Sequence, residues 1–259
     1  MCETCGCALP DRHGPARDDR TVEVLASLKT RNDRLAHHNR AHFDAAGVLV
    51  VNLMSSPGAG KTRLLEATIE ALGDRHRLAV IEGDLETEND ARRIRAKGVP
   101  AVQITTGSAC HLDAAMIHDA LHALSLEALD LLFIENVGNL VCPASFDLGQ
   151  HASVTLLSTP EGDDKPLKYP VMFRASDLVL VTKCDLLAVL DDFAVEAVAA
   201  HVRRLACPAP VLEVSASAGR IDGWLAWLEA RLAERRRSVF HPVAAHAGGD
   251  LLTRPRSPA

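Results

Sequence analysis

The stretch VVNLMSSPGAGKT, residues 50–62, decides the fold class of this 259-residue chain. It joins an apolar, strand-like run to a glycine-rich turn and ends in Gly-Lys-Thr, after which the residues follow a helical pattern. This order is that of a phosphate-binding loop (P-loop), in which backbone N–H groups surround phosphates at the positive N-terminal end of a helix. The stretch therefore predicts a nucleotide-binding protein.

The residues of this loop have separate expected tasks. Lys61 would reach the β- and γ-phosphates, and the Thr62 hydroxyl would bind Mg²⁺. Ser55 stands where the motif has its first glycine, so this position must adopt a backbone conformation that a Cβ tolerates. The predicted nucleotide-binding residues of the loop are Gly58, Ala59, Gly60, Lys61, Thr62 and Arg63.

Outward from the loop, short apolar runs alternate with helical patterns. The strand candidates are Val48–Met54, Leu78–Glu82, Pro100–Thr105, Leu129–Glu135, Val154–Ser158, Leu178–Thr182 and Val211–Ser215, and the helix candidates between them are Thr62–Leu72, Glu88–Lys97, Leu112–Leu124 and Phe193–Leu205. Nearly continuous apolar strands are typical of parallel sheets that are buried on both faces. The pattern predicts an α/β fold with a mostly parallel, twisted sheet flanked by helices.

The domain boundaries follow from composition. Residues 1–20 are rich in Cys, Gly, Pro and charge and are predicted to form a flexible tail. Residues 21–46 carry apolar side chains at helical spacing and are predicted to form a leading helix. The P-loop domain is expected over residues 47–236, and residues 237–259, rich in Pro, Ala and Gly, are expected to be disordered.

Charge and hydropathy exclude several classes of protein. A formal net charge of −6 argues against a general nucleic-acid binder. The longest apolar runs are too short to span a bilayer, and the first 20 residues hold no apolar signal core. We therefore expect a cytoplasmic protein that binds neither nucleic acid nor membrane.

Two acidic residues at predicted strand ends are candidates for holding Mg²⁺ beside Thr62. Asp84 follows the second strand candidate, and Glu135 ends the fourth. Glu135-Asn136-Val137-Gly138 is similar to the Asp-x-x-Gly switch of GTPases, so the Gly138 N–H would sense the γ-phosphate. Lys61, Thr62, Asp84 and Glu135 are the predicted catalytic residues, and the alternative is that the two acids only cap turns.

The base-reading residues are expected near the end of the sixth strand candidate. Thr182-Lys183-Cys184-Asp185 resembles the Asn-Lys-x-Asp guanine signature with Thr in its first place. Asp185 would accept hydrogen bonds from guanine N1–H and its amino group, which adenine cannot offer in that arrangement. The Lys183 stem would pack along the base, and the loop of Ser215 and Ala216 would support guanine O6 through backbone N–H groups.

The placement of the cysteines predicts a metal-binding site near the N-terminus. Three of the seven cysteines, Cys2, Cys5 and Cys7, lie at the very start of the chain. Thiolates select soft or borderline ions. A fourth ligand would be the N-terminal amine or His13, and the residues suit square-planar Ni²⁺ as well as tetrahedral Zn²⁺.

A second metal constellation depends on folding. If neighbouring strands carry Cys110-His111 and Cys142, two thiolates and an imidazole converge beside the predicted switch loop. Buried structural cysteines are an equal interpretation of the residues alone, and Cys184 and Cys207 are taken as structural. His38 and His42, four residues apart on the leading helix, have metal-ligand spacing, but a solvated polar face is favoured.

Together these motifs resemble one family. The chain is similar, over about residues 1–235, to the HypB family of hydrogenase nickel-incorporation GTPases, in the SIMIBI class of P-loop NTPases. The resemblance rests on Cys-x-x-Cys-Gly-Cys, residues 55–62, Glu135 to Pro143, Glu161 to Pro170 and Thr182-Lys183-Cys184-Asp185. The run containing Cys142 separates it from the related urease accessory GTPase UreG.

The resemblance implies a GTP-hydrolysing nickel metallochaperone for nickel–iron hydrogenase maturation, with GTP-dependent homodimerisation. It implies a tight nickel site at Cys2, Cys5 and Cys7, a weaker interface site for nickel or zinc at Cys110, His111 and Cys142, and work with the accessory protein HypA on the hydrogenase large subunit. Slow intrinsic turnover is expected. The alternatives are a passive nickel- or zinc-binding protein with a degenerate P-loop, a urease-accessory-type GTPase, and a small-molecule kinase that uses ATP.

Overall fold

The computed structural model describes the backbone of residues 19–240 and the side chains of residues 27–237. The predicted metal ligands Cys2, Cys5 and Cys7, and most of both predicted tails, lie outside the described residues. Two boundaries differ from the sequence prediction. The leading helix α1 (Asp19–Ala46) begins before residue 21, and the last helix α8 (Asp222–Phe240) continues past residue 236.

Within the described residues, seven strands form one parallel sheet in the order β3-β2-β4-β1-β5-β6-β7. The strands are β1 (Leu49–Ser55), β2 (Leu78–Asp84), β3 (Ala101–Thr105), β4 (Leu131–Glu135), β5 (Ala152–Ser158), β6 (Leu178–Thr182) and β7 (Val211–Glu213). All seven strand candidates are confirmed, with small shifts at their ends. The fold prediction of a flanked, largely parallel sheet is confirmed as well.

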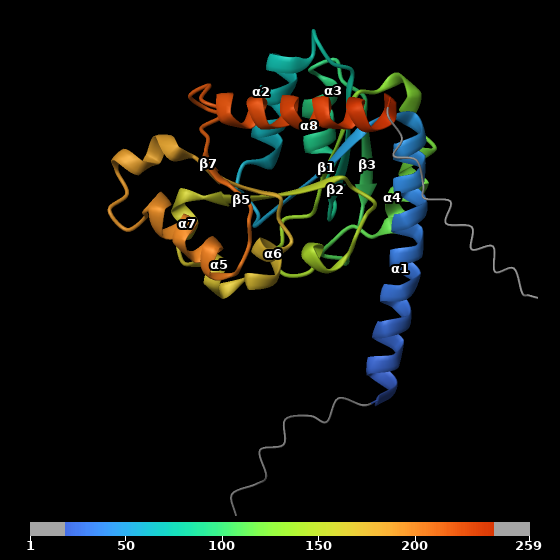
Figure 1. Ribbon diagram of the computed structural model, residues 1–259, viewed down its shortest axis with the longest axis horizontal. Helices are drawn as coiled ribbons and strands as arrows, with labels where there is room; N and C mark the ends of the chain where they lie inside the picture. The colour runs from blue at the N-terminus through green and yellow to red at the C-terminus, as the bar shows by residue number, and fades with distance from the viewer. Residues whose placement is uncertain (1–18, 241–259) are drawn as a thin grey trace, which may run out of the picture.

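Helices cover both faces of the sheet (Figure 1). The remaining α-helices are α2 (Lys61–Leu72), α3 (Asn89–Arg95), α4 (Ala114–Leu121), α5 (Lys165–Lys168), α6 (Pro170–Arg174) and α7 (Val195–Arg204), and the 3-10 helices are η1 (Leu126–Ala128), η2 (Pro143–Ser145), η3 (Thr159–Glu161) and η4 (Cys184–Ala188). On one face, α2 and α8 pack over Leu53 and Phe133; on the other, α1 and α4 pack over Val50 and Ile134. β1 is therefore buried between two helical layers, which explains its unbroken apolar run.

The long helix α8 has no counterpart among the predicted elements. Trp224 anchors it, because this side chain is fully buried and its Nε1–H donates to Thr68 Oγ1 of α2 at 2.8 Å. Its ring also stacks on Trp227. In Figure 1 α8 crosses one side of the domain, close to α2. Among the described residues, no helix has the length and apolar character that a membrane crossing requires.

Candidate nucleotide and metal sites

The phosphate loop connects β1 to α2, and its shape depends on two glycines. Gly58 has φ 74° and Gly60 has φ 95°, in the left-handed region that side chains rarely adopt. Gly60 immediately precedes α2, so the loop leads into the helix N-terminus as predicted. Ser55 is not among the described residues with positive φ, which explains how this position accommodates a Cβ.

Two side chains of the first turn of α2 contact residues at the carboxyl ends of β1 and β4. Lys61 is buried, and its Nζ donates to Ser55 Oγ at 3.0 Å. The Thr62 hydroxyl donates to Glu135 Oε1 at 2.9 Å. The serine that replaces the motif's first glycine thus provides an acceptor for the lysine ammonium, and Thr62 lies beside the predicted Mg²⁺ ligand from β4.

Glu82 is a residue of this site that sequence reasoning missed. It lies beside Glu135 in the register of β2 and β4, and both carboxyl groups are buried. Burial, and secondly the charge of Glu135, raise the pKa of Glu82 to about 11. Burial also raises the pKa of Glu135, while Lys61 opposes that shift. The alternation of side chains along a strand places Glu82 on the same face as Asp84, and that signal was present in the sequence.

These carboxyl groups lack part of their hydrogen bonding. Among the described residues, Glu82 Oε1 and Glu135 Oε2 are buried without a hydrogen-bond partner. A buried carboxyl oxygen without a hydrogen-bond partner is costly unless a cation or a donor reaches it. With the Thr62 hydroxyl, they make an all-oxygen donor set of the kind that Mg²⁺ prefers.

A single pocket gathers the predicted phosphate and magnesium residues at the carboxyl ends of β1, β2 and β4. Its lining includes Gly58, Gly60, Lys61, Thr62, Arg63, Glu82, Asp84, Glu135 and Gly138, and also Asp90 and Arg93, which were not predicted. Asp84 is oriented within its own loop, since it accepts from Glu86 N at 3.1 Å and from Thr87 Oγ1 at 3.2 Å. The position agrees with the rule that ligands of open parallel sheets bind beyond the strand carboxyl ends.

An adjoining pocket holds the predicted base-reading residues. It is lined by Ala59, Gly60, Arg63, Leu64, Thr182, Lys183, Asp185, Leu186, Val214, Ala216 and Ser217. Ser215 and Ser217 donate their hydroxyls to Asp185 Oδ1, and the Ser215 hydrogen bond holds the pKa of Asp185 below its usual value. The carboxylate is therefore ionised and oriented as a hydrogen-bond acceptor.

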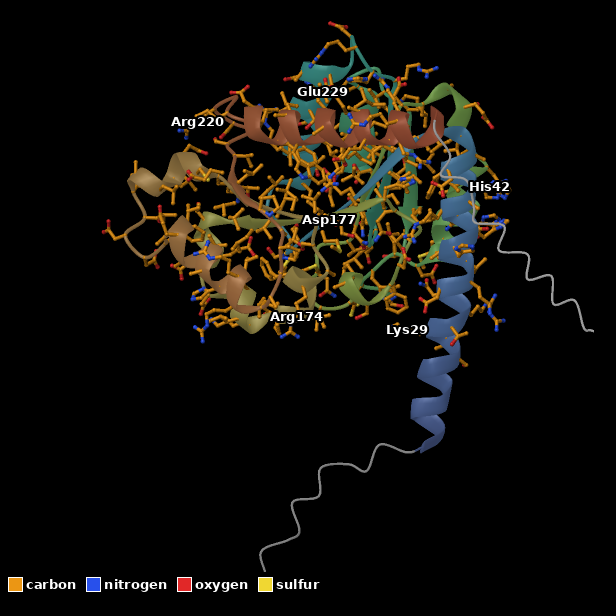
Figure 2. All side chains as sticks on the ribbon, viewed as in Figure 1. Lys29, His42, Arg174, Asp177, Arg220 and Glu229 are labelled. Atoms are coloured by element: carbon orange, nitrogen blue, oxygen red, sulfur yellow. The ribbon has the colours of Figure 1, made fainter. Side chains whose placement is uncertain are left out.

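The structure changes the role expected for Ser215. Its backbone N–H donates to the carbonyl oxygen of Arg220 at 2.9 Å, so this N–H is not free for a base. Arg220 lies on the loop at the edge of the domain (Figure 2). The Ser215 hydroxyl orients Asp185 instead. Thr182, which replaces the signature's asparagine, donates to the Ala59 carbonyl at 2.7 Å and connects this loop to the phosphate loop.

Cys110, His111 and Cys142 converge, as the folding-dependent prediction required. Their ligand atoms all lie within 4.8 Å of one another, and all three side chains are half-buried. The His111 ring stacks on Phe146 with a centroid distance of 4.0 Å, and burial lowers its pKa, which favours the neutral, metal-binding form. Two thiols and an imidazole suit Ni²⁺ or Zn²⁺.

The side chain of Asn136 connects the metal cluster to the predicted switch loop. Asn136 is buried, and its Oδ1 accepts from Leu112 N at 3.2 Å and from Val137 N at 3.0 Å. Leu112 directly follows His111, and Val137 directly precedes Gly138 in the phosphate pocket. Asn139 adds a second connection by donating to the Cys110 carbonyl at 3.3 Å.

Two other cysteines agree with their structural interpretation. Cys184 and Cys207 are buried, and each thiol donates to a backbone carbonyl at 3.1 Å, that of Val181 and that of Phe173 respectively. Burial raises the pKa of Cys184, which keeps this thiol protonated.

Comparison with known proteins gives a consistent result. Residues 49–213 match the family described as CobW/HypB/UreG, nucleotide-binding domain. The chain is 53% identical to the hydrogenase maturation factor HypB of Azotobacter chroococcum over 90% of this chain and 79% of that protein. It is 52% identical to the hydrogenase maturation factor HypB of Escherichia coli K12 over 84% of this chain and 75% of that protein.

Comparison with solved structures also shows similarity to HypB proteins. A crystal structure of HypB from Helicobacter pylori in complex with nickel superposes with a TM-score of 0.75 at 44% identity, covering 79% of this chain and 96% of that one. HypB from Archaeoglobus fulgidus gives a TM-score of 0.73 at 38% identity, covering 78% and 99%.

Proposed function

Because this chain belongs to the CobW/HypB/UreG family, and within it to the HypB hydrogenase maturation factors, we propose that it is a GTP-hydrolysing nickel metallochaperone. In this proposal, guanine-nucleotide turnover controls when the chain holds nickel and when it releases the ion for a nickel–iron hydrogenase. The observation that carries the proposal is the buried Asn136 side chain, whose single oxygen accepts from both the metal loop and the switch loop.

The phosphate pocket supports GTP hydrolysis. Lys61 would exchange its Ser55 partner for phosphate oxygens, since an ammonium forms stronger hydrogen bonds with an anion. Thr62, Glu135 and Glu82 supply the oxygen donors that fit Mg²⁺, with Asp84 beside them. When bound, Mg²⁺ would neutralise charge on the phosphates. Slow intrinsic turnover is part of the proposal.

Guanine selectivity rests on Asp185. A carboxylate fixed by two serine hydroxyls would accept hydrogen bonds from guanine N1–H and its amino group. Adenine offers an acceptor where guanine offers N1–H, so this site would leave the buried edge of adenine unpaired. The geometry therefore favours a GTPase over an ATP-dependent kinase.

Control of nickel by the nucleotide requires that the GTP and GDP states bind nickel with different affinities. A nucleotide shifts a metal equilibrium only if the two nucleotide states bind the metal differently. Movement of Gly138 with the γ-phosphate would displace Val137 and Asn136, and through Leu112 the ligands His111 and Cys110. Nickel is the proposed cargo, as in the nickel complex of the Helicobacter pylori relative, and zinc suits the same ligands. Cys2, Cys5 and Cys7 are proposed as the tighter site.

A partner surface adjoins the cluster. Val141, next to Cys142, is 58% exposed although it is apolar. We assign this surface to a second copy of the chain in the GTP-bound state, so that both clusters meet at the interface. Transfer would then involve a HypA-type accessory protein and the hydrogenase large subunit in the cytoplasm.

The decisive experiment titrates Ni²⁺, and separately Zn²⁺, into the full chain loaded with GDP–Mg²⁺ or a non-hydrolysable GTP analogue with Mg²⁺. Sedimentation measures the oligomeric state of the same samples. We expect a change in affinity at one of the metal sites between the two nucleotides, together with dimers only in the triphosphate state. Identical isotherms would instead support a passive metal-binding protein, and ATP outcompeting GTP would support a kinase.

A further inference from the structure

A second cluster of metal-ligating side chains lies away from the nucleotide pocket, where α1 and α4 pack together. His38 and His42 come from α1, and His118 comes from α4. One ring nitrogen of each histidine lies within 4.8 Å of the others. The sequence interpretation of His38 and His42 as a solvated polar face missed His118, which only the packing of the two helices brings to them.

The rings face one another rather than pointing apart into solvent. His38 Nε2 and His42 Nε2 are 3.0 Å apart, and the His38 and His118 ring centroids are 5.2 Å apart. Imidazole nitrogens that face one another so closely carry lone pairs that repel unless a proton or a metal ion lies between them. His38 and His42 are exposed, and Figure 2 shows His42 on α1 at the edge of the domain, so an ion can reach them from solvent.

Asn39 fixes the third ring. Asn39 is fully buried, and its Nδ2 donates to the carbonyls of Ala114 at 2.8 Å and Leu148 at 3.3 Å. These two bonds assign the amide orientation and leave Asn39 Oδ1 facing His118 Nδ1 at 3.1 Å. Nδ1 therefore carries the proton and Nε2 carries the lone pair. Metal-binding histidines are held in the same way, with one ring N–H donated to an oxygen and the other nitrogen free to ligate.

Further donors line a hollow beside the rings. Besides His42 and His118, it contains His122 and the carboxylate of Glu127. The His122 ring lies edge-on to His118 at a centroid distance of 5.5 Å. A fourth ligand is thus available from water, imidazole or carboxylate.

We propose that His38, His42 and His118 form a separate all-nitrogen site for one divalent first-row transition ion: nickel, zinc or copper. Neutral imidazoles suit these three ions and do not suit Mg²⁺ or Ca²⁺. The bound ion clips α1 to α4, the helix that follows the Cys110-His111 loop. The site differs from the thiolate cluster in both ligand type and position, and it does not depend on nucleotide.

Equilibrium dialysis of the full chain against Ni²⁺ alone, without nucleotide, tests the site. His38→Ala and His42→Ala change exposed positions, so they spare the core, and each is expected to bind one nickel equivalent fewer than the unmodified chain. His37→Ala removes an exposed histidine of the same helix outside the cluster and is the matched control. The nickel–thiolate absorption should be equal in all four proteins, because no thiolate is changed.

Equal nickel equivalents in His38→Ala, His42→Ala and His37→Ala would overturn the site, as would a lost equivalent accompanied by a weaker thiolate absorption. A second readout is thermal unfolding. Saturating Ni²⁺ should raise the melting temperature less in His42→Ala than in His37→Ala, because a ligand that binds only the folded state stabilises it. Failure of the histidine site would leave the proposed GTP-controlled nickel transfer untouched. Failure of that proposed function would likewise leave the histidine site untouched.

Discussion

A Cβ placed on Gly138 would lie 2.8 Å from the Cα atom of Pro57. The loop after β4 therefore presses directly on the backbone of the phosphate loop. Backbone, unlike a flexible side-chain tip, cannot give way cheaply. This contact explains why position 138 requires a glycine although its φ is not positive. In the proposed GTPase, the same contact would let the γ-phosphate move the segment that contains Gly138.

Gly138→Ala should weaken the triphosphate state selectively. Overpacking of this kind costs about 1–3 kcal/mol, so the affinity for a GTP analogue should fall by roughly tenfold or more while that for GDP changes little. Fluorescent-nucleotide titration measures both affinities. Gly223→Ala is the control, because its Cβ would meet only Leu212 at an ordinary 3.7 Å. Equal weakening of GDP and GTP binding would show that Gly138 has no sensing role.

Asp185→Asn should change base preference. Two hydrogen bonds to a charged acceptor contribute about 1.5–3 kcal/mol each, so GTP affinity should fall by roughly a hundredfold or more. The new amide N–H would instead face the carbonyl oxygen that xanthine carries in place of the guanine amino group, so XTP should bind better than GTP. Competition titration measures this, with Asp192→Asn, an exposed position outside the pocket, as control. Unchanged GTP affinity would reject the assigned base reader.

Asn136→Ala should uncouple metal from nucleotide. The variant leaves the buried Leu112 N–H unpaired, at a cost of about 1–3 kcal/mol, and cuts the connection to Val137. The ratio of nickel affinities in the GTP-analogue and GDP states should approach one. Asn32→Ala is matched to it, because it leaves the nearby Ala114 N–H unpaired without contacting the switch loop. If Asn136→Ala and Asn32→Ala both keep the nickel-affinity ratio of the unmodified chain, the coupling does not run through Asn136.

The hydrogen bonds of His151 should make the folded state less stable at acidic pH. It accepts from Val50 N at Nδ1 and donates from Nε2 to Asp44, which requires the neutral ring. Burial lowers its pKa below 6.5, assisted by Arg235 and Arg40 and opposed by Asp44. The unfolded chain thus binds the extra proton first, and stability is lost as pH falls from about 6.5 toward the folded pKa. Urea unfolding at about pH 7.5 and pH 5.5 should show a smaller loss for His151→Gln than for His37→Gln.

The sequence predicted the architecture well because its signals are local. A buried parallel strand needs a continuous apolar run, and a phosphate loop needs its glycines and lysine consecutively, so Leu49–Ser55 and Lys61 could be recognised without tertiary information. The alternation of strands and helices then required the nucleotide residues to meet at one edge of the sheet.

What escaped prediction depends on packing between distant segments. Glu82 becomes a site residue only because β2 and β4 align it with Glu135. His118 joins His42 only because α4 lies against α1. Ser215 has its backbone N–H occupied by Arg220, a contact with no signature along the chain. α8 was missed because its helical pattern is weak, and the buried Trp224 anchors it instead.

The neighbouring carboxyl groups of Glu82 and Glu135 have one more consequence. A bare triphosphate carries several negative charges, and a pocket floored by two acids repels it. In the proposed GTPase, the acids would then either meet the nucleotide together with its cation, as one less highly charged complex, or keep a proton until the cation replaces it. With the pKa of Glu82 raised to about 11, the second route would release a proton as the cation enters, so uptake of the cation should depend on pH.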